Sequence, residues 1–207
     1  MFLRIQLILA ALSGVLAVNQ NNTCPSVATI ENIDLKHLSG IWYVSEAATD
    51  KISGVCARIT FTFKTDNYTE LVIEWGNKTR QSQSGGKGTK ASGDGTGERL
   101  DVVFSDNSTT NYNILKVSYD HYALLYSCQN TTDGSDYELW KLSRKPKLAE
   151  KHAAVMDKII QENNIKFGNT FLPTDEACYN NGIAITNNVS LAILGTSLVT
   201  ILKQLLL

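Results

Sequence analysis

The 207-residue chain has no excess of charge of either sign, because 19 Lys and Arg residues stand against 20 Asp and Glu residues and the formal net charge is −1. A protein that binds nucleic acid through a basic field needs a clear excess of Lys and Arg. Nucleic acid is therefore excluded as the expected partner. With 43% hydrophobic and 19% charged residues, the composition is that of a globular protein, and the length favours one domain.

Signatures of catalysis and metal binding are also missing. The sequence has no Cys-x-x-Cys pair, no Cys/His cluster and no Gly-x-Ser-x-Gly elbow, and its three histidines lie in unrelated segments. The glycine-rich stretch 84–98 lacks the residue order of a phosphate-binding loop and predicts a pair of short strands with a loop. We therefore expect no enzyme, no catalytic residue and no metal site.

Both ends of the chain resemble processing signals. Residues 1–17 combine Arg4 with an apolar run that ends in small residues, which predicts a secretory signal peptide; a buried first helix is the alternative. Residues 189–202 are mostly apolar but fall short of the ~20 residues that span a bilayer. Following small and polar residues near Asn180, they predict a GPI-anchor signal, with Asn180 as attachment site and 181–207 removed. A plain amphipathic C-terminal tail is the alternative.

Cysteines and sequons agree with export. Four cysteines far apart predict two structural disulfides in an oxidising compartment, although their spacing leaves three connectivities open. Asn-x-Ser/Thr sequons are dense for one domain and predict glycosylation, with a further sequon at Asn188 in the C-terminal tail. The predicted glycosylation sites are Asn21, Asn67, Asn77, Asn107 and Asn130.

Hydrophobic residues alternate with polar ones in the body of the chain. This period of two is clear in 56–63 and 70–75, which a turn separates, and it is typical of an antiparallel sandwich or barrel. An amphipathic helix is expected over 148–164, lying on the outer surface of the sheet, with Leu148, His152, Val155, Met156, Ile159 and Ile160 on its apolar face. Further strands are expected at 100–104, 112–119, 122–128 and 137–142.

Three segments resemble the lipocalin family. They are LSGIWY at 38–43, the segment 112–128 with Val117-Ser118-Tyr119 in place of the family's Thr-Asp-Tyr, and LWKLSR at 139–144. The resemblance is to the branch of apolipoprotein D, Lazarillo and the insect bilin-binding lipocalins, and it extends over about residues 24–178. It implies an all-β fold: an eight-stranded antiparallel up-and-down β-barrel with one C-terminal α-helix packed outside, in a lipocalin domain over 18–180.

The resemblance also assigns roles to residues. It implies the disulfides Cys24–Cys128 and Cys56–Cys178. Gly40, Trp42, Tyr119 and Arg144 are the structural motif: Trp42 can plug one end of the barrel and Arg144 can stack on its indole. The resemblance places Trp140 in the ligand cavity, and every aliphatic candidate can equally be a plain core residue. The predicted ligand-binding residues are Trp140, Leu142, Ile59, Phe61, Leu71, Ile73 and Trp75.

The expected function is that of an extracellular lipocalin that carries a small hydrophobic ligand: a fatty acid, a sterol, a retinoid or a bilin. No cofactor is expected unless a bilin chromophore is bound. The protein is expected to be secreted or held on the outer face of the plasma membrane, with membrane contact only through a lipid anchor. The alternative is a GPI-anchored adhesion or signalling glycoprotein that uses the barrel as a scaffold for a cell-surface partner protein.

Overall fold

The computed structural model describes residues 23–49, 52, 56–76, 81–93, 97–165 and 172–173. The predicted signal peptide, the C-terminal segment 181–207 and Asn180 lie outside these residues. The helices are α1 (Leu35–Leu38) and α2 (Glu150–Glu162). The strands are β1 (Gly40–Ala48), β2 (Arg58–Thr65), β3 (Tyr68–Gly76), β4 (Gln81–Ser92), β5 (Glu98–Phe104), β6 (Thr109–Ser118), β7 (Tyr122–Thr131), β8 (Gly134–Ser143) and β9 (Leu172–Pro173).

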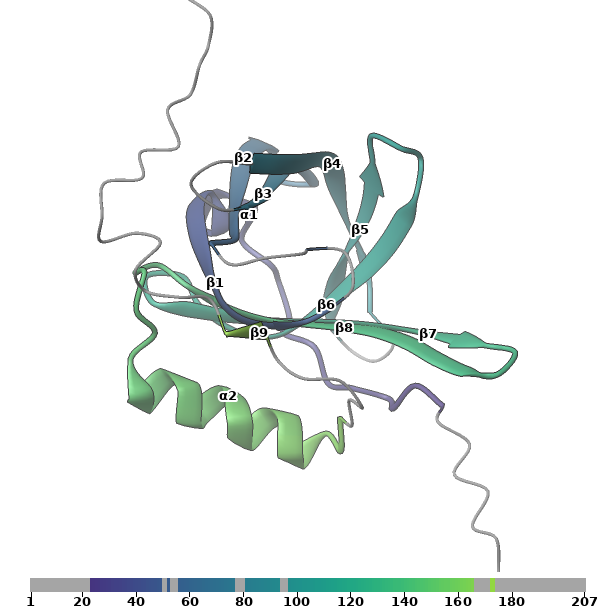
Figure 1. Cartoon of the computed structure of the whole chain (residues 1–207). Coiled ribbons are helices and arrows are strands. Elements are labelled where there is room, and N and C mark those ends of the chain that lie inside the picture. The colour runs from purple at the N-terminus through teal and green to yellow at the C-terminus, as the bar shows by residue number, and fades with distance from the viewer. Residues whose placement is uncertain are drawn as a thin grey trace, which may run out of the picture.

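The strands β1 to β8 form a closed antiparallel barrel. Each strand from β2 to β7 pairs with the next one in the sequence, and β1 pairs with both β8 and β2, which closes the ring (Figure 1). The two-residue β9 adds to β1 through Ala47 and Glu46. The predicted up-and-down β-barrel is therefore confirmed, and each of the six strands expected from alternation overlaps an observed strand.

The period of two appears directly in the strand register. Ile59 on β2 lies opposite Ile73 on β3, and Phe61 lies opposite Leu71; all four side chains are buried. The glycine-rich stretch differs from expectation in length, because its first part belongs to the twelve-residue strand β4 rather than to a short strand. Gly85, Gly86 and Gly88 leave the pairing of β4 with β3 and β5 intact, so the strand is not shortened.

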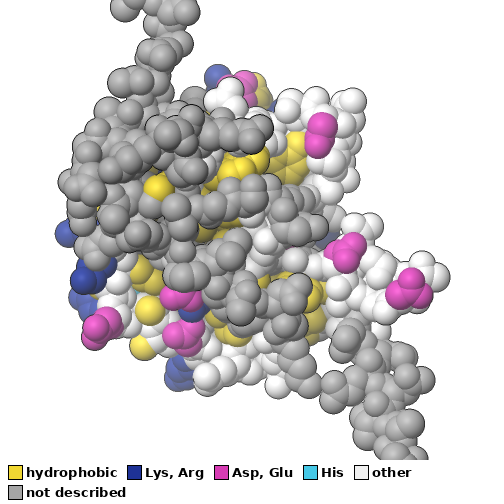
Figure 2. Space-filling view, viewed as in Figure 1, with side chains coloured by type: hydrophobic (Ala, Val, Ile, Leu, Met, Phe, Trp, Pro, Cys, Tyr) yellow, Lys and Arg dark blue, Asp and Glu magenta, His cyan; other side chains and the backbone are white. Residues whose placement is uncertain are grey.

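Helix α2 packs outside the barrel, as expected (Figure 1). Met156 and Ile160 are buried against Leu124 and Leu139, which point outward from β7 and β8. Val155, expected on the apolar face, is instead 39% exposed. It lies ~100° around the helix from Met156, which puts it at the margin of the packed face. On the face seen in Figure 2, charged side chains of both signs lie over α2.

One disulfide is visible among the described residues. Cys24 is bonded to Cys128, with the two Cα atoms 5.6 Å apart, so the N-terminal segment is fastened to β7 as the resemblance implied. Cys56 is also disulfide-bonded, and its expected partner Cys178 lies outside the described residues. Within the described part of the chain, no helix is long and apolar enough to cross a membrane.

A histidine pair joins α2 to the barrel and makes stability depend on pH. The ring of His152 stacks on that of His121 at 5.1 Å and lies 4.9 Å from the ring of Tyr122. Burial, followed by the charges of Lys151 and His121, lowers the pKa of His152 below 6.5. The folded state therefore favours the neutral ring. The contribution of neutral His152 to stability is fully present above pH 6.5 and is lost as the pH falls through the pKa of His152 in the folded state.

We expect His152→Gln to reduce the loss of thermal stability between about pH 7.5 and pH 5.5, because a neutral amide takes up no proton in that window. Melting temperatures of the wild type and variant at both pH values measure the effect. His37→Gln is the control, since the side chain of His37 is 68% exposed beside Asp34 and precedes β1. An equal acid-induced loss in wild type and His152→Gln contradicts this prediction.

Candidate functional site

One end of the barrel is closed by a tryptophan and an arginine. Trp42 is fully buried and donates its indole N–H to the carbonyl of Leu38 at 2.7 Å. The guanidinium carbon of Arg144 lies 3.8 Å from the centre of a Trp42 ring, a cation–π contact. Arg144 also donates to backbone carbonyls of the α1 end, β1 and the β6–β7 turn, namely those of His37, Ser39, Ile41 and Tyr119. Arg144 and Trp42 therefore lie in the stacked arrangement that the resemblance implied.

Gly40 and Tyr119 complete this closed end. Gly40 has φ +100°, and a Cβ there would lie 3.2 Å from Nη1 of Arg144, so a side chain would be strained and crowd the guanidinium. The hydroxyl of Tyr119 accepts a hydrogen bond from the backbone N–H of Asp34 at 2.8 Å. Tyr119 therefore still fastens the segment before α1, although the Thr and Asp of the family motif are absent.

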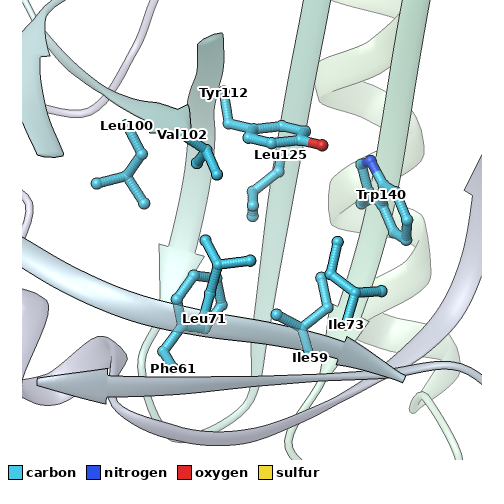
Figure 3. Close-up of a pocket in the computed structure, with 9 residues that line it drawn as sticks. All are labelled: Ile59, Phe61, Leu71, Ile73, Leu100, Val102, Tyr112, Leu125 and Trp140. Carbon is cyan, nitrogen blue, oxygen red and sulfur yellow. The ribbon is translucent and has the colours of Figure 1, made fainter. Parts of the chain in front are cut away.

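Above the closed end the barrel encloses an apolar cavity with about 300 Å³ of empty space, counting the part open to solvent. Figure 3 shows its side chains converging on a common space, and they come from β2, β3, β5, β6, β7 and β8. The residues that line it are Ile59, Phe61, Leu71, Ile73, Leu100, Val102, Tyr112, Leu125 and Trp140.

Strand β4 makes room for these side chains. Gly88 is buried, and a Cβ there would lie 3.7 Å from Cδ2 of Leu71 and 3.6 Å from Cγ2 of Val102. At Gly86 a Cβ would meet Cγ1 of Val102 at 3.0 Å. Among the described residues that line the cavity, none comes from β4. The neighbouring side chains cover its bare inner face, which explains the glycine-rich sequence.

The cavity contains five of the seven predicted ligand-binding residues: Ile59, Phe61, Leu71, Ile73 and Trp140. Leu142 shares the inward face of β8 but lies nearer the closed end, where it is buried in the barrel core rather than in the cavity lining. Trp75 is half-buried near the end of β3 and packs against the same core without lining the cavity. Sequence reasoning missed Leu100, Val102, Tyr112 and Leu125, which alternate on predicted strands and could have been found from that alternation.

A buried carboxylate adjoins this apolar lining. Glu138, only 8% exposed, accepts a hydrogen bond at Oε2 from the hydroxyl of Tyr112 at 2.9 Å and another from the indole N–H of Trp140 at 3.1 Å. Burial, followed by the charge of Glu138, raises the pKa of Tyr112 far above its ordinary value. The phenol therefore remains a donor at any physiological pH. Glu138 was not among the predicted site residues, although it stands out as a charge two positions before Trp140.

The sequons in the described part of the chain lie on the surface. Asn67, Asn107 and Asn130 are exposed, the first two in hairpin turns and the third near the end of β7. Asn130 also accepts a hydrogen bond at Oδ1 from the N–H of Cys24. Asn21 and Asn77 lie outside the described residues. Exposure makes attachment of a glycan sterically feasible, and occupancy stays a prediction. In the same described part, no group of three or more His, Cys, Asp or Glu side chains is placed to hold a metal ion.

A closed antiparallel eight-stranded barrel, with a tryptophan–arginine closed end, an apolar cavity and a helix packed outside, defines a lipocalin. The chain belongs to the Triabin family, whose model matches residues 20–168. Apolipoprotein D of Bos taurus is 23% identical over 174 residues, covering 77% of this chain and 89% of that protein. Apolipoprotein D of Cavia porcellus is 25% identical over 185 residues, covering 83% and 94%.

Solved structures show the same fold. Insecticyanin from the tobacco hornworm Manduca sexta superimposes with a TM-score of 0.58 at 15% identity, over 74% of this chain and 86% of that one. Lobster apocrustacyanin A1 also gives 0.58, at 16% identity over 72% and 90%. Proteins of this class bind small hydrophobic ligands, and the expectation that this chain is a lipocalin is confirmed.

Proposed function

We propose that this protein is an extracellular carrier that holds one small hydrophobic ligand inside its barrel. The observation that carries the proposal is the cavity inside the barrel, whose lining is aliphatic and aromatic. Burying apolar ligand surface there contributes about 25 cal/mol per Å². Fatty acids, sterols, retinoids and a bilin chromophore are the ligand classes to test.

Three features support an extracellular location for the carrier. The disulfide Cys24–Cys128 suits an oxidising compartment. Asn67 and Asn107 present sequons on exposed turns. The apolar run near the C-terminus has the composition of a GPI signal, which would tether the carrier to the outer face of the plasma membrane. Release of the protein from cells by phosphatidylinositol-specific phospholipase C tests the tether, and a requirement for detergent contradicts it.

Fluorescence titration of the full chain tests the carrier. The protein is titrated with a fatty acid, a sterol, a retinoid and biliverdin while tryptophan emission is followed. We expect saturable quenching by at least one ligand, reduced in Trp140→Phe because Trp140 lines the cavity. If none of the four ligands quenches the tryptophan emission of the folded protein, the carrier proposal fails. A surface adhesion or signalling glycoprotein is then the better hypothesis.

Filling the cavity from β4 should block binding. We expect Gly88→Leu to weaken ligand affinity by about tenfold or more, because the new side chain enters the space beside Leu71 and Val102. Thr89→Leu is the matched control: it adds a similar side chain one residue away, at an exposed position. Titration of both variants measures the effect, and equal affinities would place ligand binding outside the cavity.

A further inference from the structure

Among the described residues that line the cavity, two carry a polar side-chain atom. They are Tyr112 on β6, with its hydroxyl, and Trp140 on β8, with its indole N–H; the side chains of the others are aliphatic or phenyl groups. Backbone N–H and C=O groups in a sheet point along the sheet toward neighbouring strands, so they do not face the cavity. A hydrogen bond from this lining to a ligand acceptor must therefore come from Tyr112 or Trp140.

Both of these donors are already bonded within the protein. The hydroxyl of Tyr112 donates to Oε2 of Glu138 at 2.9 Å, and the indole N–H of Trp140 donates to the same atom at 3.1 Å. Figure 3 shows the Tyr112 oxygen and the Trp140 nitrogen turned toward one another. A phenol has one O–H and an indole has one N–H, so each residue has given its only side-chain proton. Glu138 itself is buried and is not part of the lining.

This arrangement determines what a polar ligand group meets inside the barrel. A carbonyl or carboxylate that enters the cavity loses its hydrogen bonds to water, which is costly unless the protein replaces them. Here the replacement requires breaking a bond between Glu138 and Tyr112 or Trp140, and that leaves a buried carboxylate with fewer partners. A hydrocarbon group loses no hydrogen bond on entry. Glu138 thus supplies from within the protein the acceptor oxygen that a polar ligand would otherwise bring.

We propose that Glu138, by occupying both donors of the lining, makes the cavity selective against ligands that bury a carbonyl or carboxylate group in it. The inference rests on the proposed carrier function, because it names the ligand class that the same cavity takes. That class consists of hydrocarbons and of amphiphiles whose polar group stays in water outside the cavity.

A matched pair of neutral ligands tests the selectivity on the full chain. 2-Acetylnaphthalene and 2-isopropenylnaphthalene have nearly the same shape and differ in a carbonyl oxygen that is replaced by a CH₂ group. Both compete with the fluorescent probe N-phenyl-1-naphthylamine at neutral pH. We expect the alkene to bind at least about tenfold more tightly than the ketone, because the ketone loses its bonds to water without replacement. A smaller ratio overturns the inference and leaves the carrier intact, whereas failure of the probe to bind overturns both.

The variants Glu138→Met and Glu138→Gln test the residue itself. Methionine has a similar length but leaves Tyr112 and Trp140 without their acceptor, so we expect the affinity for the ketone relative to the alkene to rise by about fivefold or more. Glutamine keeps an acceptor oxygen, so the ratio should stay at the wild-type value, which separates the hydrogen bonds from the charge. Glu70→Met is the matched control, because Glu70 is exposed on β3 and pairs with Lys64.

Two results with these variants overturn the assignment to Glu138. One is an unchanged ratio of ketone to alkene affinity in Glu138→Met, and the other is an equal shift of that ratio in Glu138→Gln. The comparison of the two ligands on wild-type protein decides the selectivity even if Glu138→Met folds poorly.

Discussion

Replacing Arg144 by methionine should lower the free energy of unfolding by about 3–4 kcal/mol. Methionine keeps the apolar stem but leaves the carbonyls of His37, Ser39, Ile41 and Tyr119 without their charged donor. It also removes the cation from the face of Trp42. Denaturant unfolding monitored by circular dichroism measures the change.

Arg144→Lys is the control for this prediction. Lysine keeps the charge but cannot reach several carbonyls with one planar fork, so we expect a loss between those of the wild type and Arg144→Met. Ligand affinity of the remaining folded protein should be unchanged in both variants, because Arg144 does not line the cavity. A loss in Arg144→Met of less than about 1 kcal/mol contradicts the closing role of the guanidinium.

Replacing Lys141 by methionine should cost about 2–4 kcal/mol of stability. The side chain of Lys141 is 4% exposed, and its Nζ lies 2.6 Å from Oε2 of Glu46 on β1 and 2.5 Å from Oδ1 of Asp157 on α2. Methionine leaves these two carboxylates facing each other without the ammonium. Because both are partly exposed, water satisfies them in part, which keeps the loss below that of a fully buried pair.

The charge of Lys141 also makes the stability of the fold depend on pH in the alkaline range. Burial works to lower its pKa, but hydrogen bonds to Asp157 and Glu46 outweigh burial and raise the pKa above 10.5. Its stabilisation is therefore complete below pH 10.5 and is lost as the pH rises through the folded pKa. Adding Glu46→Gln and Asp157→Asn to the Lys141→Met variant should recover part of the loss measured by denaturant unfolding. If the free energy of unfolding does not recover, the loss in Lys141→Met comes from changed packing and not from the two unpaired carboxylates.

The barrel could be predicted from the sequence, because the alternation of hydrophobic residues and the turn residues are local patterns of neighbouring positions. The residues that line the cavity could be predicted only in part. Leu142 has the alternation of a lining residue, but its distance along β8 from the closed end puts it in the core instead. Helix α1 was missed because four residues carry no periodicity; only Asp34, whose Oδ1 accepts from the N–H of His37, signals its start.

The carboxylate site shows a different limit. Glu138 is joined to Tyr112, 26 residues away, across the barrel interior. No spacing rule connects these positions, because β7 lies between their strands and the contact depends on how the sheet curves. The bare inner face of β4 could not be predicted for a similar reason. Glycines alone indicate a weak strand, and only the structure shows that Val102 and Leu71 occupy the space beside them.

The order of the strands also has a consequence for how the chain folds. Hairpins from β2 to β8 can form one after another from neighbouring segments, but β1 gains its second neighbour only when β8 is available. Long-range closure of this kind is slow, since a large loop must lose its freedom first. Arg144 follows β8 by one residue, so the strand that closes the barrel and the cation that covers Trp42 arrive together. We expect a nascent or truncated chain that ends before Gly134 to leave the β8-facing edge of β1 unpaired and Trp42 uncovered at once.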